Sequence, residues 1–272
     1  MFIDEQLFKF KKIIEYSIVA GGSKGKESAI RSSGLINLIH DAVKKEFIDQ
    51  GINPTKIFPH FGETNPELRL TGFLKQKKQD ICVVPSNIKR KAAVIDWDPL
   101  VYTKKTDSYG FNYTTNILSV NVRSQMSSLN KNSDTLFERT FAEALNLHMR
   151  CPDMVLGEVY LIPLHEYDDD LVKERKVGFK SRQTDIEKYI SFFNSINGRS
   201  SSERIYAYER CALLIVDFNR KTPYLFRNSY ELKQAGCISP DFGIEYATLN
   251  FQDFARDILA IYSERFDINN LK

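Results

Sequence analysis

Three polar residues in the middle of the chain lie in β-rich segments where a carboxylate and a cation could act together. Asp80 opens the short apolar run 81–85, and Asn121 and Arg123 lie in the run 116–124, the clearest strand pattern in the sequence. Such a set suits metal-assisted hydrolysis of a phosphodiester. Acidic oxygens hold a divalent ion that activates water, and a nearby cation stabilises the developing charge. The acids must then converge from neighbouring strands, or from a strand and the following helix.

The elements that would position these residues can be read from hydrophobic periodicity. Helical spacing predicts helices over 4–19, 27–50, 133–149, 184–196 and 251–266, with a break at the glycine-rich stretch 21–25. Short β-rich runs predict strands over 68–74, 79–85, 92–95, 116–124, 154–163, 211–218 and 223–226. This alternation predicts an α/β protein with a mixed central β-sheet flanked by α-helices.

Several segments have more specific expectations. The nearly continuous apolar run 154–163 predicts an interior strand covered on both faces, and 92–95 predicts a further strand or a buried segment. The polar stretch 99–114 predicts a long excursion or a hairpin tip, and 164–182, with its run of three aspartates, predicts a mobile loop. The helix over 133–149 is expected to bury Leu136, Phe137, Phe141 and Leu145. Three basic clusters could form a DNA-facing rim; they lie at 75–78, 89–91 and 104–105.

Composition limits the class of protein. The 272 residues, 42% of them hydrophobic, are enough for one large core, and the sequence has no linker or repeat. We therefore expect a single domain over 1–272, with a core at about 26–163 and a C-terminal elaboration at 164–272. The four scattered cysteines predict reduced thiols in a cytoplasmic protein, and no apolar run is long enough for a membrane span. A net charge of +3 permits nucleic-acid binding without requiring it.

The order of elements resembles a known family. A helix, three strands, a helix and a strand, with an acid on the second strand and a polar–apolar–basic triplet on the third, resemble the PD-(D/E)xK nucleases. This family includes most type II restriction endonucleases. Lys77–Pro85 is similar to the first family motif, and Ser119–Gln125 stands where the second motif belongs. The resemblance covers roughly 26–163 and lies in topology and spacing more than in letters. It implies a restriction-endonuclease-like core with Asp80 as a ligand of Mg²⁺.

The sequence departs from the family pattern at three positions. Gln79 stands where the signature has proline, Asn121 where it has a carboxylate, and Arg123 where it has lysine. Asparagine binds a metal weakly and adds no charge. Arginine stays protonated and cannot act as a base, although it can clamp a phosphate. These changes indicate either a degenerate site or a second carboxylate supplied from elsewhere.

A relocated carboxylate is available. In one branch of the family, whose members cut CCGG-like sites, the second acid lies on the helix that follows the third strand. Glu138 lies fifteen residues after Arg123, close to that spacing, so the resemblance implies Glu138 as the second metal ligand. Glu143, Glu158 and Glu27 remain open as alternatives.

The segment from Val122 to Gln125 resembles the strand end with which that branch reads guanine. Arginine suits this role because it donates two parallel hydrogen bonds to guanine O6 and N7. Arg123 is thus either the catalytic cation or a base reader, and Gln125 is expected to bind DNA beside it. The expected function is magnesium-dependent, sequence-specific cleavage of double-stranded DNA by a homodimer, whose two-fold symmetry would match a palindromic site.

Two other functions stay open. A non-catalytic DNA-binding protein on a degenerate nuclease fold is favoured by Asn121. An unrelated small-molecule enzyme is disfavoured, because the sequence has no glycine-rich cofactor loop after a strand and no nucleophile elbow. No organic cofactor is therefore expected.

Overall fold

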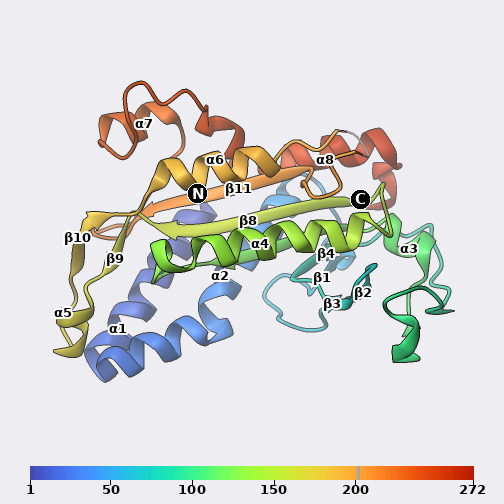
Figure 1. The fold of residues 1–272 in the computed structure, drawn as a ribbon, viewed down its shortest axis with the longest axis horizontal. Coiled ribbons are helices and arrows are strands. Elements are labelled where there is room, and N and C mark those ends of the chain that lie inside the picture. The colour runs from blue at the N-terminus through green and yellow to red at the C-terminus, as the bar shows by residue number, and fades with distance from the viewer. Residues whose placement is uncertain (201–202) are drawn as a thin grey trace.

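A six-stranded mixed sheet forms the centre of the computed structural model, which describes residues 1–200 and 203–272 (Figure 1). The strand order is β1-β4-β7-β8-β11-β12. The bounds are β1 (Ile57–Phe58), β4 (Ile81–Val83), β7 (Leu118–Ser124), β8 (Val155–Pro163), β11 (Arg210–Asp217) and β12 (Tyr224–Leu225). The strands β7, β8 and β11 are mutually parallel, and the others pair antiparallel with their neighbours. The predicted α/β class with a mixed central sheet is confirmed.

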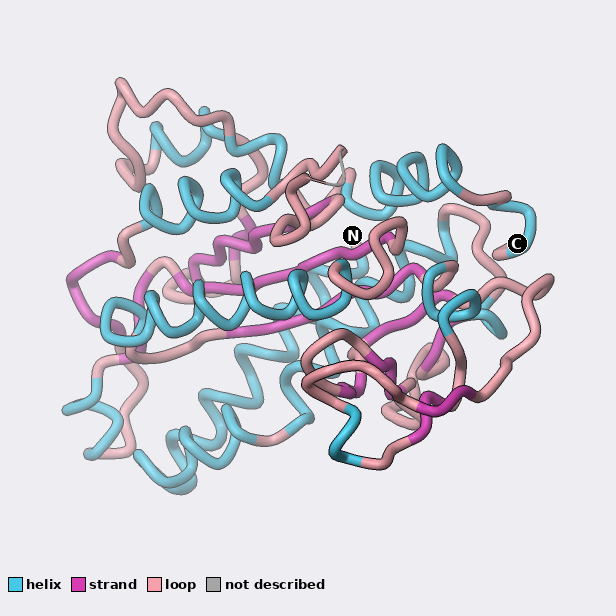
Figure 2. Tube along the Cα trace, turned by 45° about the vertical axis from the view of Figure 1, so that its right-hand side comes forward, coloured by secondary structure: helices cyan, strands magenta, loops and turns pink. Residues whose placement is uncertain are grey.

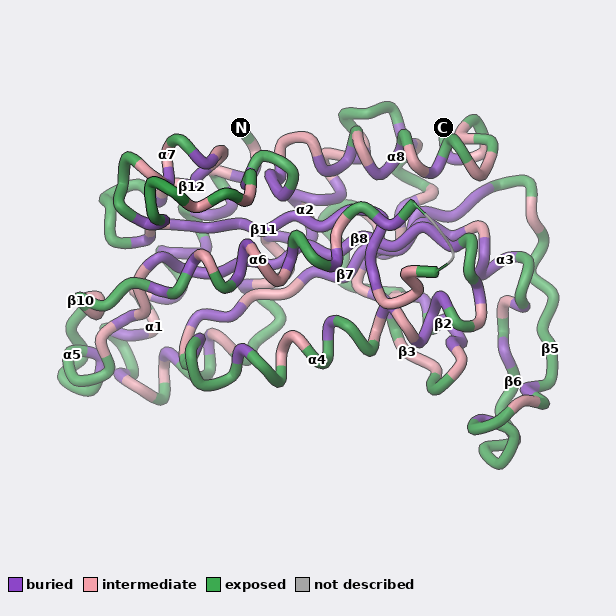
Figure 3. Tube along the Cα trace, turned by 45° about the horizontal axis from the view of Figure 1, so that its top comes forward, coloured by how far each residue is buried: buried purple, intermediate pink, exposed green. Residues whose placement is uncertain are grey.

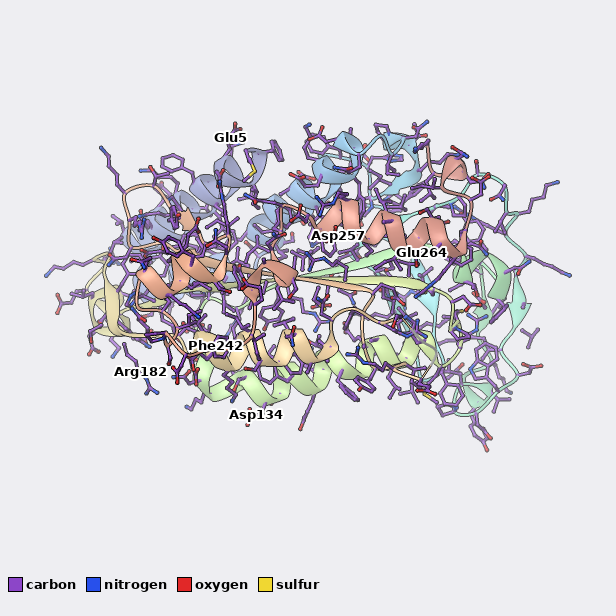
Figure 4. The ribbon with its side chains drawn as sticks, turned by 90° about the horizontal axis from the view of Figure 1, so that it is seen from above. Glu5, Asp134, Arg182, Phe242, Asp257 and Glu264 are labelled. Atoms are coloured by element: carbon purple, nitrogen blue, oxygen red, sulfur yellow. The ribbon has the colours of Figure 1, made fainter. Side chains whose placement is uncertain are left out.

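Helices cover both faces of this sheet (Figure 2). One layer consists of α1 (Phe2–Arg31), α2 (Ser33–Asp49) and α8 (Phe254–Arg265), and the other of α4 (Leu129–His148) and α6 (Ile186–Ile196). Viewed from above, α8 with Asp257 and Glu264 lies on one side of the sheet and α4 with Asp134 on the other (Figure 4). Alternate residues of each strand face alternate layers. On β7, Val120 and Val122 belong to the α1–α2–α8 core, so Asn121 and Arg123 face the α4 layer.

The interior position predicted for 154–163 is confirmed. All nine residues of β8 are buried, and the strand pairs with β7 on one side and β11 on the other. Its covered faces explain the unbroken apolar pattern. Because β11 and β12 come from the C-terminal third, that part of the chain completes the same sheet as the segment before it.

Gly157 is the point at which β8 meets α8 most closely. A Cβ atom there would lie 2.7 Å from Phe254 Cζ and 2.8 Å from Ile258 Cδ1. We expect Gly157→Ala to lower the free energy of unfolding by about 1–3 kcal/mol through overpacking. Gly21→Ala, where nothing lies within 4 Å of the added atom, should be neutral or stabilising by up to about 1 kcal/mol, because alanine favours a helix. Urea denaturation of both variants measures this, and equal stabilities would contradict it.

The two N-terminal helices differ from their predicted bounds. The predicted break at 21–25 is confirmed at Gly22, whose φ of 56° and ψ of −137° are non-helical and kink α1; a helical segment then continues to Arg31. A second break, which was not predicted, is Ser32, whose extended backbone separates α1 from α2 and whose hydroxyl donates to the carbonyl of Ala29 at 2.7 Å. Glycine permits the kink because it adopts positive φ without steric cost.

The segment 164–182 is not the mobile loop that its composition suggested. It forms β9 (His165–Tyr167), α5 (Asp169–Lys173) and β10 (Phe179–Gln183), with β9 and β10 paired antiparallel. The run of aspartates has a structural role. The carboxylate of Asp168 accepts from two N–H groups of α5, and Asp169 accepts from Lys26 of α1 at 2.8 Å. Capping and this ion pair therefore order an acidic segment that would otherwise be solvated.

Two small hairpins lie outside the central sheet. β2 (Arg69–Thr71) pairs with β3 (Gln76–Lys78), so the basic cluster 75–78 belongs to a strand. β5 (Ala93–Val94) pairs with β6 (Thr106–Asp107), so the first part of the stretch 99–114 lies at the tip of a hairpin, and α3 (Phe111–Thr115) follows. Figure 3 shows that the hairpin of β5 and β6 is mostly exposed. Val94 is 75% exposed, so the alternative of a buried segment at 92–95 is wrong. A last short helix, α7, spans Ser229–Gln234.

The buried face of α4 is rotated from the predicted one. Phe141 is 39% exposed, and Leu136, Phe137 and Leu145 are only partly buried. The buried residues of α4 include Ser133, Thr140, Ala144 and Leu147. The rotation arises because this helix packs on polar as well as apolar residues of the sheet, and it turns Thr140 toward β7.

The four cysteines, Cys82, Cys151, Cys211 and Cys237, are all buried free thiols, as expected. Among the helices of the described residues, none has both the length and the apolar character needed to cross a membrane.

Candidate active site

Three oxygen-bearing side chains form a row across three neighbouring strands. Asp80 immediately precedes β4, and the pairing of Ile81 with Val120 places it opposite Asn121. Asn121 in turn pairs in register with Glu158 of β8. The Asp80 carboxylate accepts a hydrogen bond from the Val122 N–H at 2.8 Å. This bond continues the hydrogen bonding between β4 and β7 at the point where β4 begins. The sheet thus fixes all three residues on one face.

A cleft of about 620 Å³ opens beside this row, between the junction of α1 with α2, the β3 strand and α4. Most of its charged side chains are basic. The charged residues lining it are Arg31, Lys75, Lys77, Arg123, Arg139, Asp80 and Glu143. Five cations against two acids give the cleft a positive potential, which favours an anionic ligand such as a phosphate group.

Arg123 connects the row to α4. Its guanidinium contacts the carboxylate of Glu143 and donates to the hydroxyl of Thr140 at 3.0 Å. The Nε atom of Arg123 lies 3.4 Å from a carboxylate oxygen of Glu158. The ammonium group of Lys77 also contacts Glu143. The rotation of α4 turns Thr140 and Glu143 toward the sheet, where they hold the side chains of Arg123 and Lys77 in position.

Burial controls the protonation of the acids and of Lys77. Burial raises the pKa of Glu158 to about 7; Arg123 opposes this rise and the charge of Asp80 adds to it. Burial also raises the pKa of Asp80, while the Val122 N–H and Lys77 act to lower it. Burial and the charge of Arg123 lower the pKa of Lys77. Clustered perturbed groups in a cleft are typical of functional sites.

The structure brings together some of the predicted residues. Asp80, Asn121 and Arg123 meet in and beside the cleft. Glu138 lies on the exposed face of α4 and is not among the residues that line the cleft. Glu27 is exposed on α1, 3.4 Å from Arg31. Of the acids considered as a second ligand, Glu143 lines the cleft, and Glu158 lies buried in the row beside it.

Gln125 is held inside the protein. Its side chain is buried, its carbonyl accepts from the hydroxyls of Tyr160 and Tyr189 at 3.2 Å each, and its amide donates to the carbonyl of Ser128 at 3.2 Å. Its polar groups are thus committed within the chain, where they position the end of β7. Reading a base would require it to leave these partners.

Lys77 has the clearest site role that sequence reasoning did not assign. It lies three residues before Asp80 in the segment similar to the first family motif, so a signal existed in its spacing. Its place in a hairpin strand at the cleft was hidden, however, because the basic cluster 75–78 was expected only as part of a DNA-facing rim.

The oxygen donors of the row fit a hard divalent cation. Among the described residues, no three His, Cys, Asp or Glu side chains gather closely enough to hold a metal. Mg²⁺ does not need three, because it binds through one or two carboxylates and completes its shell with water and substrate phosphate. Within the same residues, the side-chain oxygen of Asn121 and both oxygens of Glu158 are buried and receive no hydrogen bond of good geometry. A cation would satisfy all three.

Comparison with known proteins gives no family for this chain: no family model, curated protein or solved structure matches it.

Proposed function

We propose that the chain is a magnesium-dependent endonuclease of the type II restriction class that cleaves double-stranded DNA. One observation supports this most: Asp80, beside Lys77 and Arg123, opens onto a cleft rich in cations. An acid that can hold a metal, next to cations that can bind a phosphate, is the minimum that phosphodiester hydrolysis requires.

The topology supports the same reading. The strand β4, which follows Asp80, is antiparallel to β7, and β7 connects through α4 to the parallel strand β8. This is the order that the resemblance to the PD-(D/E)xK nucleases implies, and it supports a restriction-endonuclease-like core. Asp80 and the triplet Asn121–Arg123 then occupy the positions of the family's two motifs.

The cleft also suits a phosphate backbone. Ser32 and Ser33, at the N-terminus of α2, line it, and no side chain caps that helix. The N-terminus of a helix attracts anions through its free N–H groups and its dipole. Arg31 and Arg139 line the same cleft and would neutralise further phosphates.

The roles of the chain's own residues follow from this geometry. Asp80 would hold the Mg²⁺ ion, which lowers the pKa of a bound water and offsets charge on the scissile phosphate. Arg123 remains protonated, so it stabilises charge and orients the phosphate and does not act as a base. Lys77, on β3, adds a second positive charge at the cleft. Glu143 orients both cations through its contacts with them.

A homodimer would let each chain cut one strand of a palindromic site. Exposed apolar side chains on α1 favour a partner there: Tyr16 is 76% exposed and Val19 57%, and Phe8 and Ile13 are also exposed.

Incubation with supercoiled plasmid DNA tests the proposal. We expect discrete linear fragments with Mg²⁺ and intact plasmid when EDTA removes the metal. A continuous smear of fragments would show that the chain is a nuclease but would reject cleavage at specific sites. Intact plasmid under all metal conditions would overturn the proposed activity.

The second candidate is a DNA-binding protein without cleavage. Asn121 favours it, as does Arg123, which is occupied by two glutamates. A magnesium-independent mobility shift with uncut plasmid would support this candidate, and the absence of both effects would reject both.

A further inference from the structure

Glu158 is a carboxylate buried at the centre of the sheet. It is 0% exposed in the middle of β8, between Asn121 of β7 and Cys211 of β11 in register. A buried carboxylate costs several kcal/mol unless a cation and hydrogen bonds compensate it. Apolar residues surround this position along β8, so the acid requires a specific reason.

The partners of Glu158 within the described residues do not compensate it. Its one ion pair there is with Arg123 at 3.4 Å, through a guanidinium that also serves Glu143 and Thr140. The Asn121 amide acts on Glu158 as a hydrogen-bond donor that lowers the pKa of its carboxyl. Within the described residues, however, no hydrogen bond of good geometry reaches either carboxylate oxygen or the side-chain oxygen of Asn121. The two carboxylate oxygens therefore depend on one shared guanidinium and one amide, and the side-chain oxygen of Asn121 has no donor.

We propose that Glu158, Asn121 and Asp80 form a divalent-cation site along the row beside this cleft, with Asp80 at the cleft and Glu158 as the second, buried carboxylate. The inference rests on the proposed function and differs from what the resemblance implies, which is an acid at position 121 or on the following helix. All the donors are oxygens, which hard cations such as Mg²⁺ and Mn²⁺ prefer. Glu158, on the neighbouring strand β8, would supply the negative charge that position 121 lacks.

The sheet makes this exchange possible. Neighbouring strands lie about 4.8 Å apart, so the backbones of Asp80 and Glu158 are separated by about 10 Å, with the Asn121 strand between them. The longer glutamate side chain can extend over the shorter asparagine toward Asp80. An asparagine at the central position avoids a third negative charge between two carboxylates.

The other acids are less suited. Glu143 already contacts both Lys77 and Arg123, and these two cations would compete with a metal for its oxygens. Glu138 is exposed on α4 and belongs neither to the strand row nor to the lining of the cleft. When Glu158 binds a cation, Arg123 keeps Glu143 and Thr140 as partners, so its charge stays compensated.

Direct titration with Mn²⁺, followed by electron paramagnetic resonance of the free ion, tests this site without DNA. We expect one Mn²⁺ bound per chain and at least about tenfold weaker binding in Glu158→Gln, which keeps the shape and removes the charge. Glu264→Gln is the matched control, because Glu264 is exposed on α8 (Figure 4) and does not line the cleft. Its affinity should equal that of the original chain.

A second variant covers the case in which Glu158→Gln does not fold, as judged by circular dichroism. Asn121→Asp adds a charge inside the same site and should tighten Mn²⁺ binding. Unchanged affinity in a folded Glu158→Gln protein, weaker binding in Glu138→Gln instead, or no Mn²⁺ binding by the original chain would overturn the inference. Binding that depends on Glu158 in a protein that leaves plasmid uncut would uphold the site and reject only the nuclease function.

Discussion

Replacing Asp80 by asparagine should abolish DNA cleavage and leave DNA binding intact. We expect a loss of at least about 10³-fold in the rate of cutting, since removing a metal-binding carboxylate forfeits roughly 4 kcal/mol or more of transition-state stabilisation. Asparagine has the same shape, and its side-chain oxygen can still accept from the Val122 N–H, which Asp80 accepts at 2.8 Å. The fold should therefore survive the change.

Binding and cleavage must be measured separately for this variant. The affinity of Asp80→Asn for DNA, measured with EDTA, should equal or exceed that of the original chain, because the change removes a negative charge near phosphate. Asp241→Asn is a suitable control, since Asp241 is an exposed aspartate remote in sequence from the cleft residues. A folded Asp80→Asn protein that cuts within tenfold of the original rate would show that Asp80 is not a metal ligand. A large loss of DNA affinity would show that its role is structural.

The sequence predicts more of the fold than of the candidate site. The sheet strands were visible because β-branched and apolar residues concentrate in them, and the buried strand β8 had the clearest pattern. Periodicity reports which residues are apolar, but it does not report how polar residues pair across elements. The rotation of α4 followed from such pairing: Thr140 and Glu143 contact Arg123, which no local pattern encodes.

The site shows the same limit. Asp80 and Arg123 could be selected from their own strands, but the role of Glu158 depends on strand order. Only the parallel pairing of β8 with β7 places it beside Asn121. In the sequence, Glu158 is a single acid in an apolar run, and its neighbours in space lie 37 and 78 residues away. The register of two strands depends on the tertiary structure. The sequence therefore offered Glu158 as one of several possible second carboxylates but could not select it.

Glu209 presents a different kind of buried acid, one whose partners are complete. Its carboxylate accepts from Arg199 at 2.7 Å, from Arg265 at 2.8 Å and from the Leu156 N–H at 2.8 Å. His148 lies 3.4 Å away. The group is 0% exposed and joins β8, the start of β11 and the end of α8. Burial alone would raise the pKa of Glu209, but His148, Arg265 and the Leu156 N–H together lower it to about 2.

Neutralising Glu209 should therefore cost more stability than any surface change. We expect Glu209→Gln to lower the free energy of unfolding at pH 7 by about 3–5 kcal/mol, because it leaves the buried guanidinium of Arg199 without its counter-charge. Glu264→Gln, one residue from Arg265 and exposed, should change stability by less than about 0.5 kcal/mol. Urea denaturation measures both.

The pH dependence distinguishes this charge effect from a packing defect. A carboxylate whose pKa is lower in the folded than in the unfolded chain stabilises the fold above its unfolded value and loses that contribution as the pH falls. For Glu209 the loss should run from about pH 4.5 down to about pH 2 and amount to about 3 kcal/mol. Glutamine does not titrate, so the stability gap between the two proteins should narrow over this range. A gap that stays constant as the pH falls would mean that the ionised carboxylate of Glu209 is not what stabilises the junction of β8, β11 and α8.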